Sequence, residues 1–186
     1  MSTGQFRRPR EVTGPRLRFR DAGPPDAEFI LSLRLDPRRG AHLSPTDPDL
    51  DAQRRWLKAY AGDPSQVYFI VEDGDHTPVG TVRLYDPQGQ SFCWGSWILN
   101  GDAPPSSAVE STLMVYAFAL ACGFTAAHFD VRRGNEKVWQ YHERFGATRT
   151  GEDELDFYYA IGEAQIHAAL ERYSDRIPDG VAISWE

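Results

Sequence analysis

The 186-residue sequence has few of the features that mark secreted, membrane or metal-binding proteins. Its only cysteines, Cys93 and Cys122, belong to no paired motif, so we expect neither a disulfide framework nor a structural zinc site. The five histidines are scattered without ligand spacing, and we expect no metal. No apolar run approaches the roughly 20 residues of a membrane span, and the N-terminus lacks the apolar core of a signal peptide. These absences predict a cytoplasmic protein that does not bind membranes.

A basic surface is also missing. The formal net charge is −7, and six of the arginines fall within residues 1–20, so the rest of the chain is more acidic than the total suggests. Binding to nucleic-acid phosphates needs a basic face, and we therefore expect no nucleic-acid partner. An acidic body suits a cationic or amine-bearing substrate, although the same balance is ordinary for soluble proteins.

The length is that of one domain, and hydrophobic periodicity divides it into alternating strands and helices. The expected strands are 16–20, 67–72, 79–85, 92–99, 126–131 and 155–161, with a turn or short strand at 148–151. The expected helices are 27–35, 50–61, 106–122, 135–145 and 163–173.

The two ends of the chain are expected to lie outside the main domain. Residues 1–15 contain Gly, Pro and Arg with almost no apolar side chains, which predicts a flexible arm. The main domain is expected over residues 16–162. Residues 163–186 then form a C-terminal helix and tail, whose apolar end could fold back or pair with a second copy in a homodimer.

The most informative stretch runs from Val131 to Ala147. Gly134 ends a strand, and Asn135 is a good N-cap because its side-chain oxygen can accept from an amide of the first helical turn. Apolar and aromatic residues then recur at helical spacing until Gly146 ends the helix.

This stretch resembles the acetyl-CoA-dependent N-acetyltransferases of the GNAT superfamily. In these enzymes an Asn opens the last helix of the cofactor site, and an aromatic pair followed by Gly closes it. Here the matching positions are Asn135, Tyr141–His142 and Gly146–Ala147. The expected order β-α-α-β-β-β-α-β-α-β over residues 16–162 is also that of the superfamily.

The resemblance implies an α/β (α+β) GNAT fold, with a mixed central sheet of six to seven strands flanked by about four helices. The run from Gly146 to Glu154 is similar to two branches of the superfamily. One acetylates amino sugars attached to nucleotides, and the other acetylates the N-termini of ribosomal proteins.

The resemblance also places the acetyl-CoA. Pantetheine is expected to pair with the strand that ends at Leu99, and the phosphates with the start of the next helix. The loop there departs from the family, because Asn100–Ala108 has no Arg or Lys and contains two prolines. Ser107 and Glu110 fit a capping box, which would occupy the first amides. The implied cofactor-binding residues are Trp97, Ile98, Leu99, Ser106, Ser107, Ala108, Asn135 and Val138.

Acetyl transfer needs a base for the amine, donors for the oxyanion and an acid for the thiolate. The superfamily usually has Tyr as the acid seven residues after the Asn, where this chain has His142; an imidazole there could donate a proton near neutral pH. Tyr141 is the alternative acid, about 100° away on the helix, and the third alternative is that no side chain serves as a dedicated acid. The candidate bases are Glu72, His128 and Asp130, each of which could instead be a surface or hydrogen-bonded polar group.

The resulting hypothesis is an acyltransferase that moves an acetyl group from acetyl-CoA to the primary amine of a small molecule, a nucleotide-linked amino sugar. Two alternatives remain open. The chain could be a catalytically inactive GNAT-fold binding module, which the depleted phosphate loop favours, or a protein N-terminal acetyltransferase.

Overall fold

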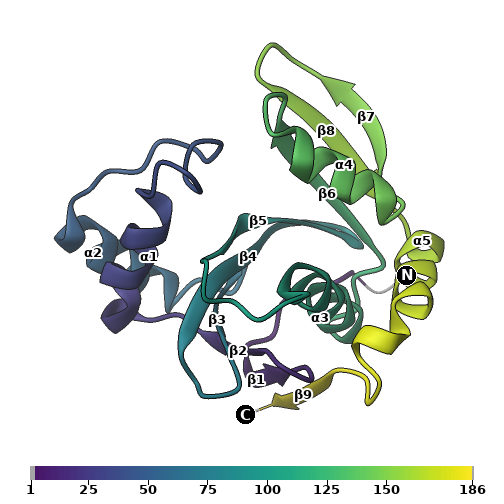
Figure 1. Ribbon diagram of the computed structural model, residues 1–186, viewed down its shortest axis with the longest axis horizontal. Coiled ribbons are helices and arrows are strands. Elements are labelled where there is room, and N and C mark those ends of the chain that lie inside the picture. The colour runs from purple at the N-terminus through teal and green to yellow at the C-terminus, as the bar shows by residue number, and fades with distance from the viewer. Residues whose placement is uncertain (1–2, 186) are drawn as a thin grey trace.

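The computed structural model describes residues 3–185, which form one mixed nine-stranded sheet flanked by helices (Figure 1). The strands are β1 (Pro9–Thr13), β2 (Arg18–Asp21), β3 (Val67–Glu72), β4 (Pro78–Gln88), β5 (Ser91–Leu99), β6 (Ala126–Arg132), β7 (Thr148–Glu152), β8 (Asp156–Ile161) and β9 (Ala182–Trp185). The helices are α1 (Ala27–Arg34), α2 (Leu50–Tyr60), α3 (Ser107–Ala121), α4 (Glu136–Arg144) and α5 (Glu163–Arg172), with short 3-10 turns η1 (Pro24–Asp26) and η2 (Ser174–Arg176). The expected elements are therefore present, and the sheet is larger than the six to seven strands predicted.

The strand order across the sheet is β7-β8-β6-β5-β4-β3-β2-β1-β9. All described pairs are antiparallel except β5 with β6, because α3 carries the chain back between these two strands. This one parallel pair lies near the middle of the sheet, and α3 begins at the end of β5.

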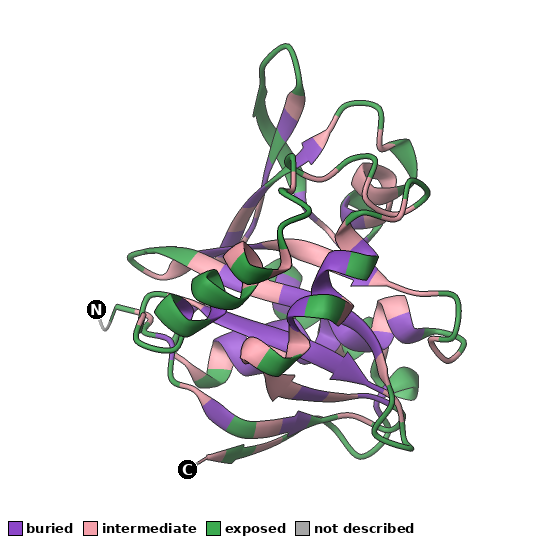
Figure 2. Ribbon diagram, turned by 90° about the vertical axis from the view of Figure 1, so that its left-hand side faces the viewer, coloured by how far each residue is buried: buried purple, intermediate pink, exposed green. Residues whose placement is uncertain are grey.

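Both faces of the central strands are covered. Phe69 and Val71 of β3 belong to the main core with α3, while Tyr68 and Ile70 pack under α1 and α2. Every residue of β3 is accordingly buried, as expected for a strand with helices on both sides. Figure 2 looks onto α1 and α2, whose outer faces are exposed while the sheet behind them is buried.

The ends of the chain belong to this sheet, so the expectation of a flexible arm over residues 1–15 is wrong for the residues that the structure describes; residues 1 and 2 lie outside them. β1 pairs with β2 on one side and with β9 on the other. Phe6 and Val12 are buried in the main core. The C-terminal tail folds back on its own chain, with Trp185 packed against Phe118 of α3 at 6.0 Å between ring centroids.

A substitution at Val12 tests this placement of β1. Val12 has no exposed surface, so Val12→Ala should lower the free energy of unfolding by about 2 kcal/mol, from lost apolar burial and the cavity left behind. Urea unfolding followed by circular dichroism measures this change. The matched control is Thr13→Ala at the exposed next position. Equal unfolding midpoints for the two variants would mean that the segment is an arm after all.

Candidate active site

The parting of β5 and β6 creates the opening in which the candidate site lies. The two strands pair only where Ser91–Cys93 runs beside Ala126–His128. Beyond Cys93, β5 continues to Leu99 and β6 to Arg132 without further pairing between them (Figure 1). Backbone amides and carbonyls that leave a ladder need other partners. An extended amide-bearing ligand such as pantetheine fits this edge of β5.

A β-bulge in β5 shapes the edge of the opening. Arg83 pairs with Gly95 and Thr81 with Ile98, so β5 has one more residue than β4 between these pairs. Ser96 lies in the bulge with a φ of 46°, and its carbonyl accepts from Thr81 Oγ1 at 2.8 Å. After the bulge, the Trp97 indole donates to Ser111 Oγ of α3 at 3.1 Å, which joins the parted strand to α3.

The start of α3 differs from the predicted capping box. The Glu110 carboxylate accepts from the amides of Arg16 and Leu17, both at 2.8 Å, because α3 lies against the turn between β1 and β2. The Ser107 hydroxyl donates to the Pro104 carbonyl at 2.6 Å, so its proton is already used. The capping box is therefore wrong.

The amides of Ala108 and Val109 consequently have no acceptor among the described residues. Free amides at a helix N-terminus favour a bound anion, and residues of the loop thus fit the phosphates of coenzyme A. Of the three predicted contacts, the Ala108 amide and the Ser106 side chain are compatible with this role, whereas the Ser107 hydroxyl is not.

The loop Asn100–Ala108 has no Arg or Lys, but two arginines from distant segments of the chain contact it. Arg176 of η2 donates from Nη1 to Ser106 Oγ at 2.8 Å, and Arg16 donates from Nη1 to the Pro105 carbonyl at 3.1 Å. The lack of cations in the loop, together with His142 in place of the usual Tyr, was a reason for considering an inactive binding module, and these two guanidinium groups supply the missing positive charge. No local pattern in the sequence pointed to Arg176, which lies 70 residues beyond Ser106.

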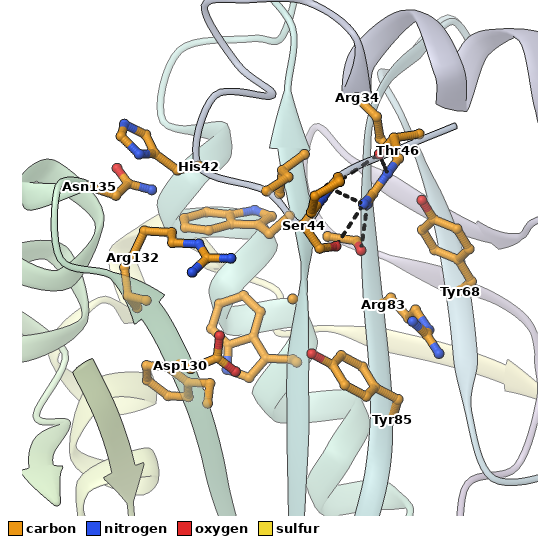
Figure 3. A pocket seen from close by; sticks show the side chains of 18 of the residues that line it. Arg34, His42, Ser44, Thr46, Tyr68, Arg83, Tyr85, Asp130, Arg132 and Asn135 are labelled. Atoms are coloured by element: carbon orange, nitrogen blue, oxygen red, sulfur yellow. Dashed lines mark hydrogen bonds between the residues drawn. The ribbon is translucent and has the colours of Figure 1, made fainter. Parts of the chain in front are cut away.

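Asn135 lines the cavity described below instead of capping α4. Its side chain makes no capping hydrogen bond, contrary to the prediction, and Figure 3 shows it near His42 at the rim. Val138, one turn further along α4, lines the same cavity. The Asn135 side-chain amide is thereby left available to a ligand.

The cavity has a volume of about 550 Å³ and lies over the bulged part of β5. Its walls come from α1, α2 and the segment 42–47 on one side and from β6 and α4 on the other. Figure 3 shows Asp130 and Arg132 on the β6 side and Arg34 and Arg83 on the opposite side. The volume is in the usual range for small-molecule sites.

His142 lines the inner part of the cavity among aromatic rings. Its ring centroid lies 4.3 Å from that of Phe129 and 5.2 Å from that of Trp94. Its Nδ1 is buried and has no hydrogen-bond partner among the described residues. Burial lowers the pKa of His142 to about 3, so the imidazole is neutral near pH 7. This burial argues against a protonated His142 as the acid near neutral pH.

Tyr141 points away from His142, toward α3. Its hydroxyl lies 2.9 Å from Thr112 Oγ1 and 3.0 Å from the Ala108 carbonyl. Burial raises the pKa of Tyr141 above its ordinary value. The hydroxyl therefore ties α4 to the start of α3, and this side chain is not among those that line the cavity.

The three candidate bases have different surroundings. Glu72 is buried and paired with Arg20 at 2.5 Å and Arg18 at 3.2 Å, because β2 lies directly beside β3. It does not line the cavity, which argues against its predicted role as base. His128 lies between Ser91 Oγ at 2.7 Å and Asp86 at 3.1 Å, also outside the cavity, which argues against its predicted role as base.

Asp130 alone among these three candidates lines the cavity. Desolvation raises the pKa of Asp130, and the nearby Asp156 acts in the same direction while Arg132 opposes it. No described cation pairs with its carboxylate within salt-bridge distance. Asp130 is thus an unpaired carboxylate of increased basicity beside the opening between the strands.

Comparisons with known proteins agree with this arrangement. The sequence profile of the family described as "Acetyltransferase (GNAT) domain" matches residues 16–148, more than half of the chain. The chain belongs to the GNAT acetyltransferases. It is similar to the solved structure of "Apo FdhC – a nucleotide-linked sugar GNAT", with 34% identity, a TM-score of 0.81 and coverage of 90% of this chain and 98% of that one.

Other GNAT structures share the fold at lower identity. A spermidine N-acetyltransferase from Vibrio cholerae, solved in complex with CoA and spermine, has 16% identity, a TM-score of 0.72 and coverage of 81% of this chain and 98% of that one. An acetyltransferase structure from T. thermophilus has 18% identity, a TM-score of 0.72 and coverage of 92% and 99%. No protein of curated function matches the chain.

This GNAT protein is accordingly an acetyl-CoA-dependent N-acetyltransferase. Among residues 3–185, no helix has both the length and the apolar character to cross a bilayer. The same residues contain no cluster of three or more His, Cys, Asp or Glu side chains able to hold a metal ion.

Removing the Arg176 guanidinium should weaken cofactor binding. We expect Arg176→Ala to raise the KM for acetyl-CoA about 5-fold to 10-fold at low ionic strength, since one charge-assisted contact to a phosphate contributes about 1 kcal/mol at a half-exposed site. The kcat should change less than twofold. The matched control is Arg172→Ala, because Arg172 is a cation on α5 whose described contact is with the Tyr173 ring. An unchanged KM for Arg176→Ala would place the phosphates elsewhere.

The buried His142 should make the protein sensitive to acid. Its pKa is about 3 in the folded state and near 6.5 in the unfolded state, so the unfolded state binds more protons as the pH falls below 6.5. Between pH 7 and 5 this should remove about 2 kcal/mol of stability. In His142→Phe that part of the loss should disappear, as measured by urea unfolding at each pH. Parallel stability curves for the two proteins would contradict the buried neutral state.

Proposed function

We propose that the chain acetylates the primary amine of a nucleotide-linked amino sugar, with Asp130 as the group that takes the proton from the amine. The observation that carries this proposal is the distribution of charge in the cavity. The unpaired carboxylate of Asp130 lies at the end next to the opening between β5 and β6, where the one arginine, Arg132, pairs with Asp156 at 3.3 Å. Two arginines without a carboxylate partner lie at the other end. An acceptor with an amine at one end and an anionic group at the other fits both ends.

Acetyl-CoA supplies the activated acyl group, and its thioester would lie in the opening beside Trp97 and His142. The bulged edge of β5, up to Ile98 and Leu99, offers backbone amides to the oxyanion. Asp130 faces the amine that approaches from the cavity. Its raised pKa makes it a better proton acceptor than an ordinary aspartate.

The relative at 34% identity supports the choice of acceptor, since it is described as a nucleotide-linked sugar GNAT. A protein N-terminal acetyltransferase is the competing function. An extended peptide offers no anionic group that must lie at a fixed distance from its amine, so the two half-buried arginines would have no use in that reaction.

A substrate panel tests the proposal. Incubation with acetyl-CoA and mass spectrometry should show acetylation of a nucleotide-linked amino sugar with a kcat/KM at least 100-fold above that of the free amino sugar and of short peptides. Asp130→Asn should lower kcat by roughly 10²-fold or more on the same acceptor, because a positioned base contributes at least that much. Acetyl-CoA affinity should not change.

The pH profile gives a second readout for Asp130. Since the base must be ionised, the rate should fall as the pH drops through the raised pKa of Asp130, and this acid limb should be missing in Asp130→Asn. The control is Asp86→Asn, which changes a carboxylate on β4 outside the cavity and should keep wild-type kinetics. Preferential acetylation of peptides would establish the competing function instead.

A further inference from the structure

The two arginines at the far end of the cavity have no carboxylate partner. Arg34 donates from Nη1 to Ser96 Oγ at 3.1 Å and from Nε to Thr46 Oγ1 at 2.8 Å, both neutral hydroxyls. Arg83 donates from Nε to the neutral amide oxygen of Gln66 at 2.6 Å. Among the described residues, neither guanidinium forms a salt bridge, although both are half-buried.

Two uncompensated positive charges in one cavity are costly without an anion. Burial lowers the pKa of Arg83, and the charge of Arg34 acts in the same direction. Asp47 is the one acidic side chain of the loop that lines this end, and its carboxylate accepts from the Asp49 amide at 2.9 Å. The cavity therefore has room and charge for a doubly anionic group.

An aromatic surface lies next to these arginines. Trp56 of α2 stacks on Tyr60 with 5.7 Å between centroids and an interplanar angle of 3°. One face of the indole is thus used, yet Trp56 is still 37% exposed and lines the cavity. The Arg83 guanidinium lies 5.2 Å from its ring centroid. Gln53, one turn earlier on α2, also lines the cavity and its side-chain amide has no partner among the described residues.

We propose that this end of the cavity binds a nucleoside diphosphate, with the base packed against the exposed part of the Trp56 indole beside Arg83 and the diphosphate between Arg83 and Arg34. Flat aromatic surfaces bind bases of any kind by stacking, and guanidinium groups match phosphate oxygens. The Gln53 amide can donate to and accept from the edge of the base. The site is lined by different elements from the proposed phosphate site of coenzyme A at α3.

This inference adds a nucleotide-binding site to the proposed function. It rests on that function only for the identity of the acceptor amine. With the diphosphate on the arginines, a sugar attached to it would extend toward Asp130, as the arrangement in Figure 3 indicates. Binding of the nucleotide part does not depend on which amine is acetylated, so it can be measured separately.

Calorimetric titration with UDP, ADP and inorganic pyrophosphate, in the presence of saturating CoA, tests the site. We expect UDP or ADP to bind wild-type protein at least 10-fold more tightly than pyrophosphate. Trp56→Ala should lose at least 10-fold in affinity for the nucleotide and little for pyrophosphate, whose unchanged binding also shows that the variant is folded. Arg83→Ala should weaken all ligands. The control is Arg55→Ala, because Arg55 is an exposed cation of α2 that pairs with Asp49. This variant should bind all three ligands as tightly as the wild type.

Three results would overturn the inference: equal affinity for nucleotide and pyrophosphate, loss of nucleotide binding when CoA is added, or unchanged nucleotide binding in Trp56→Ala. The second would mean that this end holds the adenosine of CoA. Failure of the proposed function looks different. UDP would then bind as expected while no nucleotide-linked amino sugar is acetylated.

Discussion

The separation of β5 from β6 is the constraint on which the site depends. Two parallel strands that stop pairing in the middle of a sheet leave backbone groups that must find other partners. The structure meets this requirement in part with side chains, including the bond from Arg39 Nε to the Leu99 carbonyl at 3.0 Å. The remaining edge is open to an extended ligand, and α3, α4 and the cavity are all arranged around it.

Backbone strain is concentrated at the same place. Of the four described non-glycine residues with positive φ, Ser96 lies in the bulge of β5 and Ser106 at the start of α3. Such conformations cost free energy and persist where the surrounding structure holds them. Here the bulge is held by Thr81 and Arg34, and the helix start by Arg176. Both strained residues border the route proposed for acetyl-CoA.

Much of the fold could be predicted because its elements have strong local patterns. The strand 67–72 and the helices 50–61 and 106–122 were found within a few residues of their actual ends. The strand β1 was missed because its five residues carry little apolar pattern and one of its two partner strands, β9, lies at the far end of the sequence.

The site was predicted less completely, since electrostatic roles depend on neighbours brought together by folding. Glu72 was a reasonable candidate base until β2 placed Arg18 and Arg20 beside it. His142 lines the cavity, but burial among aromatic rings lowers its pKa, which the sequence did not reveal. The capping box failed because Glu110 found backbone amides of another segment.

The pairing of β1 with β9 has a consequence for how the protein is made. The first and last strands of the chain are neighbours, and Arg176 lies on the path between α5 and β9. During synthesis β1 exists long before β9, so this edge of β1 stays uncovered until residues 182–185 have left the ribosome. Arg176, one of the two guanidinium groups beside the start of α3, emerges at a similarly late stage. A nascent chain can therefore form most of its hydrophobic core before this sheet edge is covered and before the proposed phosphate site gains its second cation.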